Sequence, residues 1–232
     1  MAAGIDAVLV AAGRGVRLGA PVDKAFVKLR GQEMLVRAAR MLDSSPLVSR
    51  LVVVAPPGRE DEARRLLGPL SKVAACVAGG AERADSVREG LAALGLGGAS
   101  AAPLVAVHDA ARPLASGALL ARLAHAIPGW QGVVPVLPIG DTVKEVEGDK
   151  VLRTLDRGRL VAVQTPQLFD AAALAEAHAR ASAEGFSGTD DAQLLERAGF
   201  AVRTVEGEAH NLKITLPEDL ELAEHWLGSG GL

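Results

Sequence analysis

Short apolar segments alternate with helical patterns along most of this chain, and that alternation limits the possible fold more than any other feature. The apolar segments are Ile5–Val10, Leu51–Ala55, Val73–Val77, Leu104–Val107, Gly132–Leu137, Leu160–Val163 and Ala201–Val205. Continuous apolar segments of this length are typical of strands that are buried on both faces. Between most of them apolar residues recur at helical spacing, as in Leu35, Ala38, Ala39 and Leu42. We therefore expect an α/β fold, a mostly parallel twisted sheet covered by helices, in one domain spanning residues 1–232.

The composition of the chain argues against several classes of protein. No apolar run approaches the roughly 18 residues of a membrane span, and the apolar start carries Asp6 without a basic segment before it, so we expect neither a membrane anchor nor a signal peptide. The cytoplasm is the expected compartment. A formal charge of −3 argues against nucleic-acid binding as the main task. The single cysteine, Cys76, excludes a thiolate zinc site and is expected in the core.

The first apolar segment runs directly into a loop of small residues, Ala11 to Gly15, and the cations Arg17 and Lys24 follow. Small residues allow the backbone to approach a ligand closely, and the two glycines can adopt positive φ. Backbone N–H groups in such a turn bind anionic oxygens, and nearby cations neutralise them. The loop lacks the Gly-Lys-Ser/Thr of a Walker loop and the third glycine of a dinucleotide-binding motif. Two interpretations stay open, an ordinary strand-to-helix turn and a cradle for a nucleoside triphosphate.

The segment Asp141–Asp156 breaks the alternation of strands and helices. Three valines are separated by charged residues, and Gly148-Asp149 is typical of a hairpin turn. A hairpin this polar does not suit a sheet that is covered on both faces, so we expect residues 139–158 to project as an arm. An isolated two-stranded ribbon is marginally stable and needs a partner surface. That surface is either a second copy of the chain, which would make a homodimer, or the arm's own domain.

Two segments place polar residues after glycines or after an apolar strand. Gly79-Gly80 opens an amphipathic helix, in which Ser86 is placed either to reach a bound base or to face solvent. Asp109 and Arg112 follow the strand that ends at Val107, where ligands bind in open α/β sheets. Asp109 suits Mg²⁺ and Arg112 suits a phosphate, although the two side chains can also simply pair with each other. His108 is expected to be a packed histidine.

Three later segments contain further polar residues. Thr165 precedes a proline at the end of an apolar segment, where its hydroxyl suits a substrate phosphate or hydroxyl. Thr189 and Asp190 have the pattern of a helix N-terminus, which is a site for anions as well as a plain N-cap. Lys213 stands alone among apolar neighbours, shortly before a helix that Thr215 and Glu218 are expected to cap as a capping box.

All of these motifs occur in one order, AAGRGVRL with Lys24, GGAERADSV, HDAARP, Asp141-Thr142, Asp156-Arg157, TPQ, TDD and NLKIT-x-PEDL. The first motif resembles the sugar-nucleotide-type nucleotidyltransferases. The ordered set resembles the 2-C-methyl-D-erythritol 4-phosphate cytidylyltransferase family over roughly residues 5 to 227. Ribitol-5-phosphate cytidylyltransferases share most of these motifs and are the alternative. The resemblance implies a Rossmann-like nucleotidyltransferase domain that transfers CMP from CTP to 2-C-methyl-D-erythritol 4-phosphate in the non-mevalonate isoprenoid route, with Mg²⁺.

The resemblance also implies a role for each matching position. The residues that would bind CTP are Ala11, Ala12, Gly13, Gly15, Gly80, Ala81, Ser86, Asp109 and Ala110. Those that would bind the polyol phosphate are Arg112, Thr142, Arg157, Thr165, Thr189 and Lys213. Arg17, Lys24 and Lys213 would be catalytic, and Asp109 would face the metal. Arg157 would reach the site of a partner subunit on the arm of a homodimer.

The chain departs from the family pattern at three positions. Ala81 stands where the family usually has an acid, Val10 where it has proline, and Ala25 where it has glutamine. None of these three departures removes a cation of the motifs, such as Arg17 or Lys24. A phosphate monoester is ionised at neutral pH, so the expected reaction needs no general base. A protein that kept the fold and binds nucleotide without chemistry is a further alternative, against which the retained cations argue.

Overall fold

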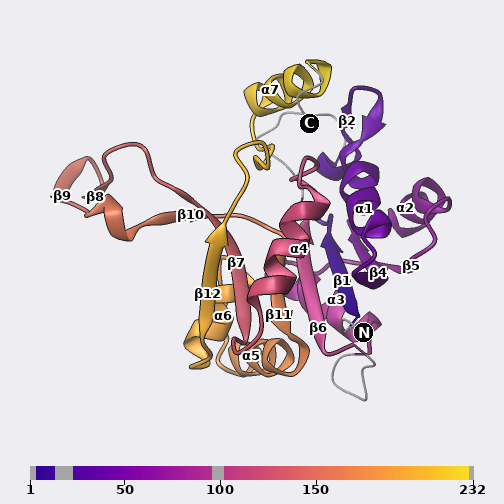
Figure 1. Ribbon diagram of the computed structural model, residues 1–232, viewed down its shortest axis with the longest axis horizontal. Helices are drawn as coiled ribbons and strands as arrows, with labels where there is room; N and C mark the ends of the chain where they lie inside the picture. The colour runs from indigo at the N-terminus through magenta and orange to yellow at the C-terminus, as the bar shows by residue number, and fades with distance from the viewer. Residues whose placement is uncertain (1–3, 14–22, 96–101, 230–232) are drawn as a thin grey trace.

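An eight-stranded sheet lies at the centre of the structure, a computed structural model that describes residues 4–13, 23–95 and 102–229. The strand order is β10-β7-β11-β6-β1-β4-β5, with β12 paired to β7 (Figure 1). The strands are β1 (Ile5–Val10), β4 (Val48–Ala55), β5 (Val73–Ala78), β6 (Leu104–Asp109), β7 (Gly132–Pro138), β10 (Val161–Val163), β11 (Gln167–Asp170) and β12 (Val202–Glu206). The seven predicted apolar segments all form strands of this sheet, with ends that differ by a few residues.

Parallel pairing dominates the sheet, as predicted. β1 pairs in parallel with β4 and β6, β4 with β5, and β7 with β12. The exceptions are β10, antiparallel to β7, and β11, antiparallel to β6 and β7. Strand β11 was not predicted, because it is four residues long with polar Gln167 and Asp170 at its ends. Since Gln167 is opposite Val107, the antiparallel register brings Thr165 beside Asp109 at the carboxyl end of β6.

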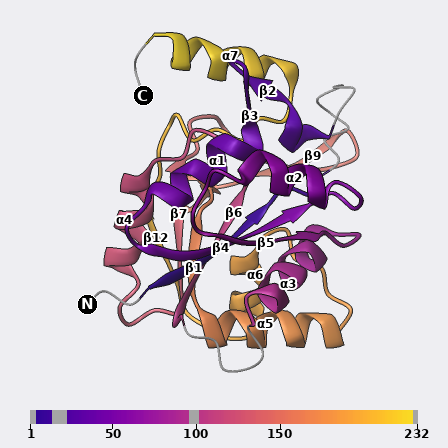
Figure 2. The same ribbon diagram turned by 90° about the vertical axis from the view of Figure 1, so that its right-hand side faces the viewer.

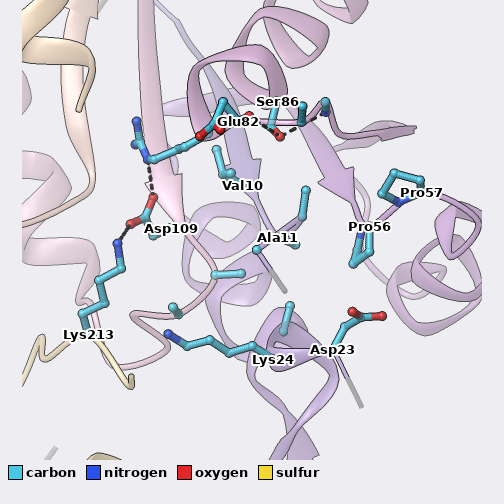
Figure 3. A pocket seen from close by; sticks show the side chains of 18 of the residues that line it. Val10, Ala11, Asp23, Lys24, Pro56, Pro57, Glu82, Ser86, Asp109 and Lys213 are labelled. Carbon is cyan, nitrogen blue, oxygen red and sulfur yellow. Dashed lines mark hydrogen bonds and ion pairs between the residues drawn. The ribbon is translucent and has the colours of Figure 1, made fainter. Parts of the chain in front are cut away.

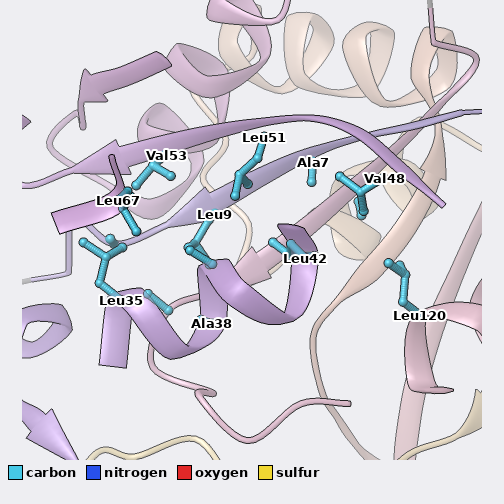
Figure 4. Close-up of a cluster of buried hydrophobic side chains, with 14 of the residues drawn as sticks. Ala7, Leu9, Leu35, Ala38, Leu42, Val48, Leu51, Val53, Leu67 and Leu120 are labelled. Atoms are coloured by element: carbon cyan, nitrogen blue, oxygen red, sulfur yellow. The ribbon is translucent and has the colours of Figure 1, made fainter. Parts of the chain in front are cut away.

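Helices cover both faces of the sheet (Figure 2). One face carries α1 (Met34–Ser44), α2 (Glu60–Leu67) and α4 (Gly117–Ala126), and the other carries α3 (Arg83–Ala93), α5 (Ala171–Ala183) and α6 (Asp191–Arg197). Side chains of β1 alternate between the two cores, with Leu9 in the first and Val8 in the second. Leu9 packs with Leu35 and Leu42 of α1 (Figure 4). The predicted stripe of α1 is therefore the face that joins it to the sheet.

A two-stranded ribbon projects from the body of the molecule, as the sequence predicted (Figure 1). It consists of β8 (Lys144–Glu147) and β9 (Lys150–Thr154), which are antiparallel, with Gly148 at positive φ in the turn between them. The residues of β9 are all exposed. Val146, Val151 and Leu152 present apolar side chains to solvent on this arm. An arm with exposed apolar side chains fits a ribbon that packs on another surface.

The chain ends in helix α7 (Pro217–Gly228), which packs against a small cluster around Leu29 and Ile214. The predicted capping box of Thr215 and Glu218 is wrong. Instead, the Asp219 carboxylate accepts hydrogen bonds from the backbone N–H groups of Thr215 and Leu216, at 2.7 and 2.8 Å. The carboxylate of Asp219, one residue further along the helix than Glu218, thus binds the N–H of the N-cap residue Leu216 and that of the residue before it. The N-cap residue Leu216 is 47% exposed.

Short elements complete the architecture around the strand ends. They are η2 (Lys24–Phe26), β2 (Lys28–Leu29), β3 (Gln32–Glu33) and η3 (Arg157–Arg159). Cys76 is buried on β5, as expected of a core residue. Among the described helices, none combines the length and the apolar character that crossing a bilayer requires.

Candidate active site

A cavity of about 640 Å³ opens at the carboxyl ends of β1 and β6 (Figure 3). Its walls contain ten of the residues selected from the sequence: Ala11, Ala12, Gly13, Lys24, Gly80, Ala81, Ser86, Asp109, Ala110 and Lys213. The backbone N–H of Ala11 donates to the backbone carbonyl of Val54 at 2.8 Å, which fixes Ala11 beside β4. Gly15 and Arg17 lie outside the described residues. The cavity is large enough for a small-molecule ligand.

The Gly79-Gly80 turn forms one wall of this cavity, and its glycines are required by close packing. A Cβ at Gly79 would lie 2.3 Å from the Cβ of Ala12, and one at Gly80 would lie 2.3 Å from that of Asp85. Ser86 is buried beneath the turn, where its hydroxyl accepts from the Gly80 N–H at 3.2 Å and donates to the Glu82 carbonyl at 3.1 Å. Ser86 therefore fixes the shape of the turn.

Asp109 ends β6 and forms ion pairs with two cations. The nitrogen Nε of Arg83 lies 3.2 Å from its Oδ1, and Nζ of Lys213 lies 2.7 Å from its Oδ2. Burial alone would raise the pKa of the Asp109 carboxyl, but the charges of Arg83 and then Lys213 outweigh burial and hold that pKa well below its usual value. Asp109 is thus an ionised carboxylate at the cavity wall. Figure 3 shows Lys24 pointing toward the same side of the cavity.

A second cavity, of about 250 Å³, shares three residues with the first: Arg83, Asp109 and Lys213. Its other walls include Arg112, Thr165 and Thr189. The Thr165 hydroxyl is buried and accepts from the Asp109 N–H at 3.0 Å. Sequence patterns therefore identified residues from both cavities, and the antiparallel β11 explains how Thr165 reaches Asp109.

Arg112 does not pair directly with Asp109, which the sequence had left open as an alternative. Its guanidinium donates to the backbone carbonyls of Asn211 and Val163, at 2.8 and 3.1 Å. Burial lowers the pKa of Arg112, and the positive charge of Arg83 lowers it further. The negative charge of Asp109 raises that pKa but does not outweigh these two effects. Arg112 thus ties the segment before Lys213 to the strand before Thr165.

His108 is a packed histidine, as expected. Its side chain is fully buried, with Nδ1 2.9 Å from the Thr165 hydroxyl and Nε2 3.2 Å from the Arg112 carbonyl. Burial disfavours the charged ring and lowers the pKa of His108 from 6.5 to about 4. A neutral imidazole therefore lies behind the cavity wall.

The two arm residues selected from the sequence line neither cavity of this chain. Thr142 and Arg157 are exposed, and Arg157 donates a hydrogen bond to the carbonyl of Gly140 at the base of the arm. Thr189 is exposed at the rim of the smaller cavity, and its N–H donates to the Gln193 side chain at 2.8 Å. Asp190 is the N-cap of α6, which confirms the capping role that the sequence suggested for this segment.

Arg83 is the main site residue that the sequence patterns missed. It lines both cavities and is the first residue of α3. Its position three residues after Gly80, at the start of a helix, was the available signal. Its partners Asp109 and Asp191 are 26 and 108 residues away, so no local pattern indicates the pairing.

Comparison with known proteins agrees with this geometry. The family model for 2-C-methyl-D-erythritol 4-phosphate cytidylyltransferase matches residues 5–229. The chain belongs to this family. A relative of that name from Symbiobacterium thermophilum is 44% identical over 221 residues, which cover 95% of this chain and 91% of the relative. Another from Frankia casuarinae is 46% identical over 222 residues, covering 95% and 80%.

Solved structures of the cytidylyltransferase family have the same fold. The 4-diphosphocytidyl-2C-methyl-D-erythritol synthase from Anaerococcus prevotii superposes with a TM-score of 0.85 at 29% identity, covering 98% of this chain and 100% of the other. The 2-C-methyl-D-erythritol 4-phosphate cytidylyltransferase from Thermus thermophilus gives a TM-score of 0.77 at 38% identity, covering 97% and 98%. The sheet and helices described above are therefore shared with these solved structures over almost the whole of this chain.

Proposed function

We propose that the two cavities divide the cytidylyl transfer between them, with CTP in the larger and the phosphate of 2-C-methyl-D-erythritol 4-phosphate at the smaller. The chain is a cytidylyltransferase of isoprenoid biosynthesis by its family. The observation that carries the division is the shared wall of Arg83, Asp109 and Lys213. Two phosphates that react with each other have to meet at such a boundary.

The reaction needs positioning and positive charge more than proton transfer. A phosphate oxygen of the methylerythritol phosphate attacks the α-phosphorus of CTP and forms a new P–O bond. The bond from that phosphorus to the oxygen bridging to the β-phosphorus breaks, and pyrophosphate leaves with the bonding electron pair. The second pKa of a phosphate monoester is near 6, so the nucleophile is already ionised at pH 7. Repulsion between the two anions is the barrier that cations lower.

Each group of residues has a role in this proposal. The backbone of residues 11–13 and Gly15 would approach the triphosphate, and the turn at Gly80 and Ala81 would border the base, with Ala110 near the ribose. Arg17, Lys24 and Lys213 would neutralise the phosphates in the transition state. Arg112, Thr165 and Thr189 would border the substrate phosphate, because they line the smaller cavity.

We further propose Mg²⁺ as the cofactor, held by Asp109 together with phosphate oxygens of CTP. Mg²⁺ prefers one or two carboxylates completed by substrate phosphates, and Asp109 offers an ionised carboxylate at the cavity wall. The described residues bring no three potential ligands together, which fits an ion that arrives with the nucleotide. When bound, the ion would add positive charge at the phosphates. The pair of Asp109 with Lys213, the more exposed of its two cationic partners, would have to open.

The arm supports a further proposal, a homodimer in which Thr142 and Arg157 act in the site of the partner. Both residues lie away from this chain's own cavities, at the base of a ribbon with exposed apolar side chains. A two-fold exchange of arms would cover those side chains in both copies. We place this enzyme in the cytoplasm, where its nucleotide substrate is available.

Replacement of the cations tests the proposed roles. Lys24→Ala and Lys213→Ala should each lower kcat by about 100- to 1000-fold, on the scale of removing one donor to a transition-state anion. Lys28→Ala is the control, because Lys28 is a solvent-exposed lysine paired loosely with Glu33 at 3.7 Å, and such pairs contribute little. Steady-state kinetics and melting temperatures are measured on all three. Near-normal kcat in Lys24→Ala and Lys213→Ala would contradict the assignment.

A further inference from the structure

A buried chain of charged and polar side chains extends from the active site into the core. Arg83 binds Asp109 through Nε at 3.2 Å and Asp191 through Nη1 at 2.8 Å. The other oxygen of Asp191 lies 2.9 Å from Nε2 of His178. Four elements contribute to this chain: β6, α3, α6 and α5. Through Arg83 of α3, it therefore links the carboxylate at the cavity wall to helices α6 and α5.

The far end of the chain has no access to substrate. Asp191 and His178 line neither cavity, and their side chains are 1% and 3% exposed. Within the described residues, the third guanidinium nitrogen of Arg83, Nη2, has no hydrogen-bond partner, so two carboxylates alone fix the guanidinium plane. Burial of a carboxylate is unfavourable unless it is paired. A function in placing Arg83 would account for the presence of Asp191 here.

We propose that Asp191, held by His178, is a positioning residue that fixes the Asp109 carboxylate through Arg83. This inference rests on the proposed role of Asp109 at the reacting phosphates. The guanidinium is a rigid planar fork, so engagement of Nη1 by Asp191 leaves Nε for Asp109. Without Asp191, the guanidinium loses one of its two anchors and can rotate, so that Nε and the neighbouring Nη2, which has no partner within the described residues, can engage Asp109 in a bidentate pair. The carboxylate would then be turned and more strongly neutralised than the reaction requires.

A double-mutant cycle separates positioning from a merely structural role. Asp191→Asn keeps the shape of the side chain and should lower kcat by about 10- to 100-fold, as for groups that orient a metal or site ligand. KM for CTP should change much less, because Asp191 does not line the cavity proposed for CTP. In an Arg83→Met background the same Asp191→Asn change should lower kcat by less than about twofold, because the path to Asp109 is already absent.

Two further variants keep the test decisive. Arg83→Lys retains the charge but provides one nitrogen in place of a fork, so it should reproduce the kcat loss of Asp191→Asn. It therefore tests the same idea if Asp191→Asn folds poorly. The double variant Arg197→Met/Glu184→Gln is the control, because this exposed pair at 2.7 Å also connects α6 to the end of α5. Its kcat should stay within about twofold of wild type.

The outcomes distinguish this inference from the proposed function. Equal losses of kcat for Asp191→Asn in the wild-type and Arg83→Met backgrounds, or losses that follow the melting temperature alone, would overturn the positioning role. An unchanged kcat in Asp191→Asn would overturn it as well. A wild-type protein that does not release pyrophosphate from CTP and methylerythritol phosphate would overturn the proposed function instead.

Discussion

At the scale of single residues, His108 shows how burial sets the charge of a group behind the site. Its folded pKa of about 4 lies below the value of 6.5 that it has in an unfolded chain. Between these values the unfolded chain binds the extra proton. The free energy of unfolding should therefore decrease as pH falls from about 6.5 to 4, by up to about 3 kcal/mol from this group.

Replacement of His108 tests this pH dependence. His108→Asn should flatten the dependence of unfolding free energy on pH between 4 and 6.5, since the asparagine does not titrate there. Urea unfolding in metal-free buffer at several pH values measures the slope. His125→Asn, on the exposed side of α4, controls for the loss of a histidine. Parallel wild-type and His108→Asn slopes would show that His108 is not held neutral.

The glycine turn gives a second prediction at this scale. Gly79→Ala places a Cβ 2.3 Å from Ala12 and 2.8 Å from the Ser86 hydroxyl, so the turn and the β1 loop must separate. An overpacked contact costs about 1–3 kcal/mol, and we expect the Kd for CTP to rise by about tenfold. Gly117→Ala, with open space around the new Cβ, is the control. Calorimetric CTP titration that gives the wild-type Kd for Gly79→Ala would contradict the prediction.

Residues of the site were predictable where a strand ends and a small-residue or polar motif follows at once. Asp109, Gly80 and the Ala11 loop are of this kind, and all three line the larger cavity. The Arg83 network was not predictable, because its carboxylates come from β6 and α6 and meet only in the folded chain. The capping error at Thr215 has a local cause, since Asp219 and Glu218 are adjacent acids that compete for the same donors.

At the scale of elements, the arm and β11 illustrate opposite cases. The arm was predictable because its alternation of valine and charge, with Gly148-Asp149, is a local signal. Strand β11 was not, because its four residues become a strand only between β6 and β7. Tertiary pairing thus decided the second element and local sequence the first.

Shortening the arm tests its proposed role. The backbone of Leu155 donates to Val143 at 2.9 Å, so the two ends lie side by side and a short glycine turn can replace residues 144–154. We expect a folded monomer with little activity, because exposed apolar side chains such as Val146 and Val151 are removed from the subunit contact. Lys150→Ala at the tip is the control. Light scattering measures the oligomeric state and steady-state kinetics measure the activity. A fully active monomer would contradict a shared site.

At the scale of the whole molecule, the fold brings together residues that are far apart in the sequence. Lys213 lies 104 residues from Asp109 along the chain and 2.7 Å from it in space. The alternation of strands and helices was sufficient to predict the parallel sheet and which strand ends carry the site. The division into two cavities needed the structure, because it depends on the antiparallel β11 and on Arg83.

Removal of divalent metal is a test at this scale. Treatment with EDTA should abolish turnover, and added Mg²⁺ should restore it, since charge at the phosphates lowers the barrier. The melting temperature without CTP should stay unchanged, because the described residues form no cluster of three metal ligands. Turnover that persists after complete removal of metal would argue against the Asp109 role.

The most direct test of the account is pyrophosphate release in the presence of Mg²⁺, with CTP or UTP crossed against methylerythritol phosphate or ribitol 5-phosphate. The account predicts release with CTP and methylerythritol phosphate alone. Release with ribitol 5-phosphate in its place would keep the fold and chemistry but contradict the assigned substrate. No release in any combination, while CTP still raises the melting temperature, would contradict catalysis and leave a nucleotide-binding protein.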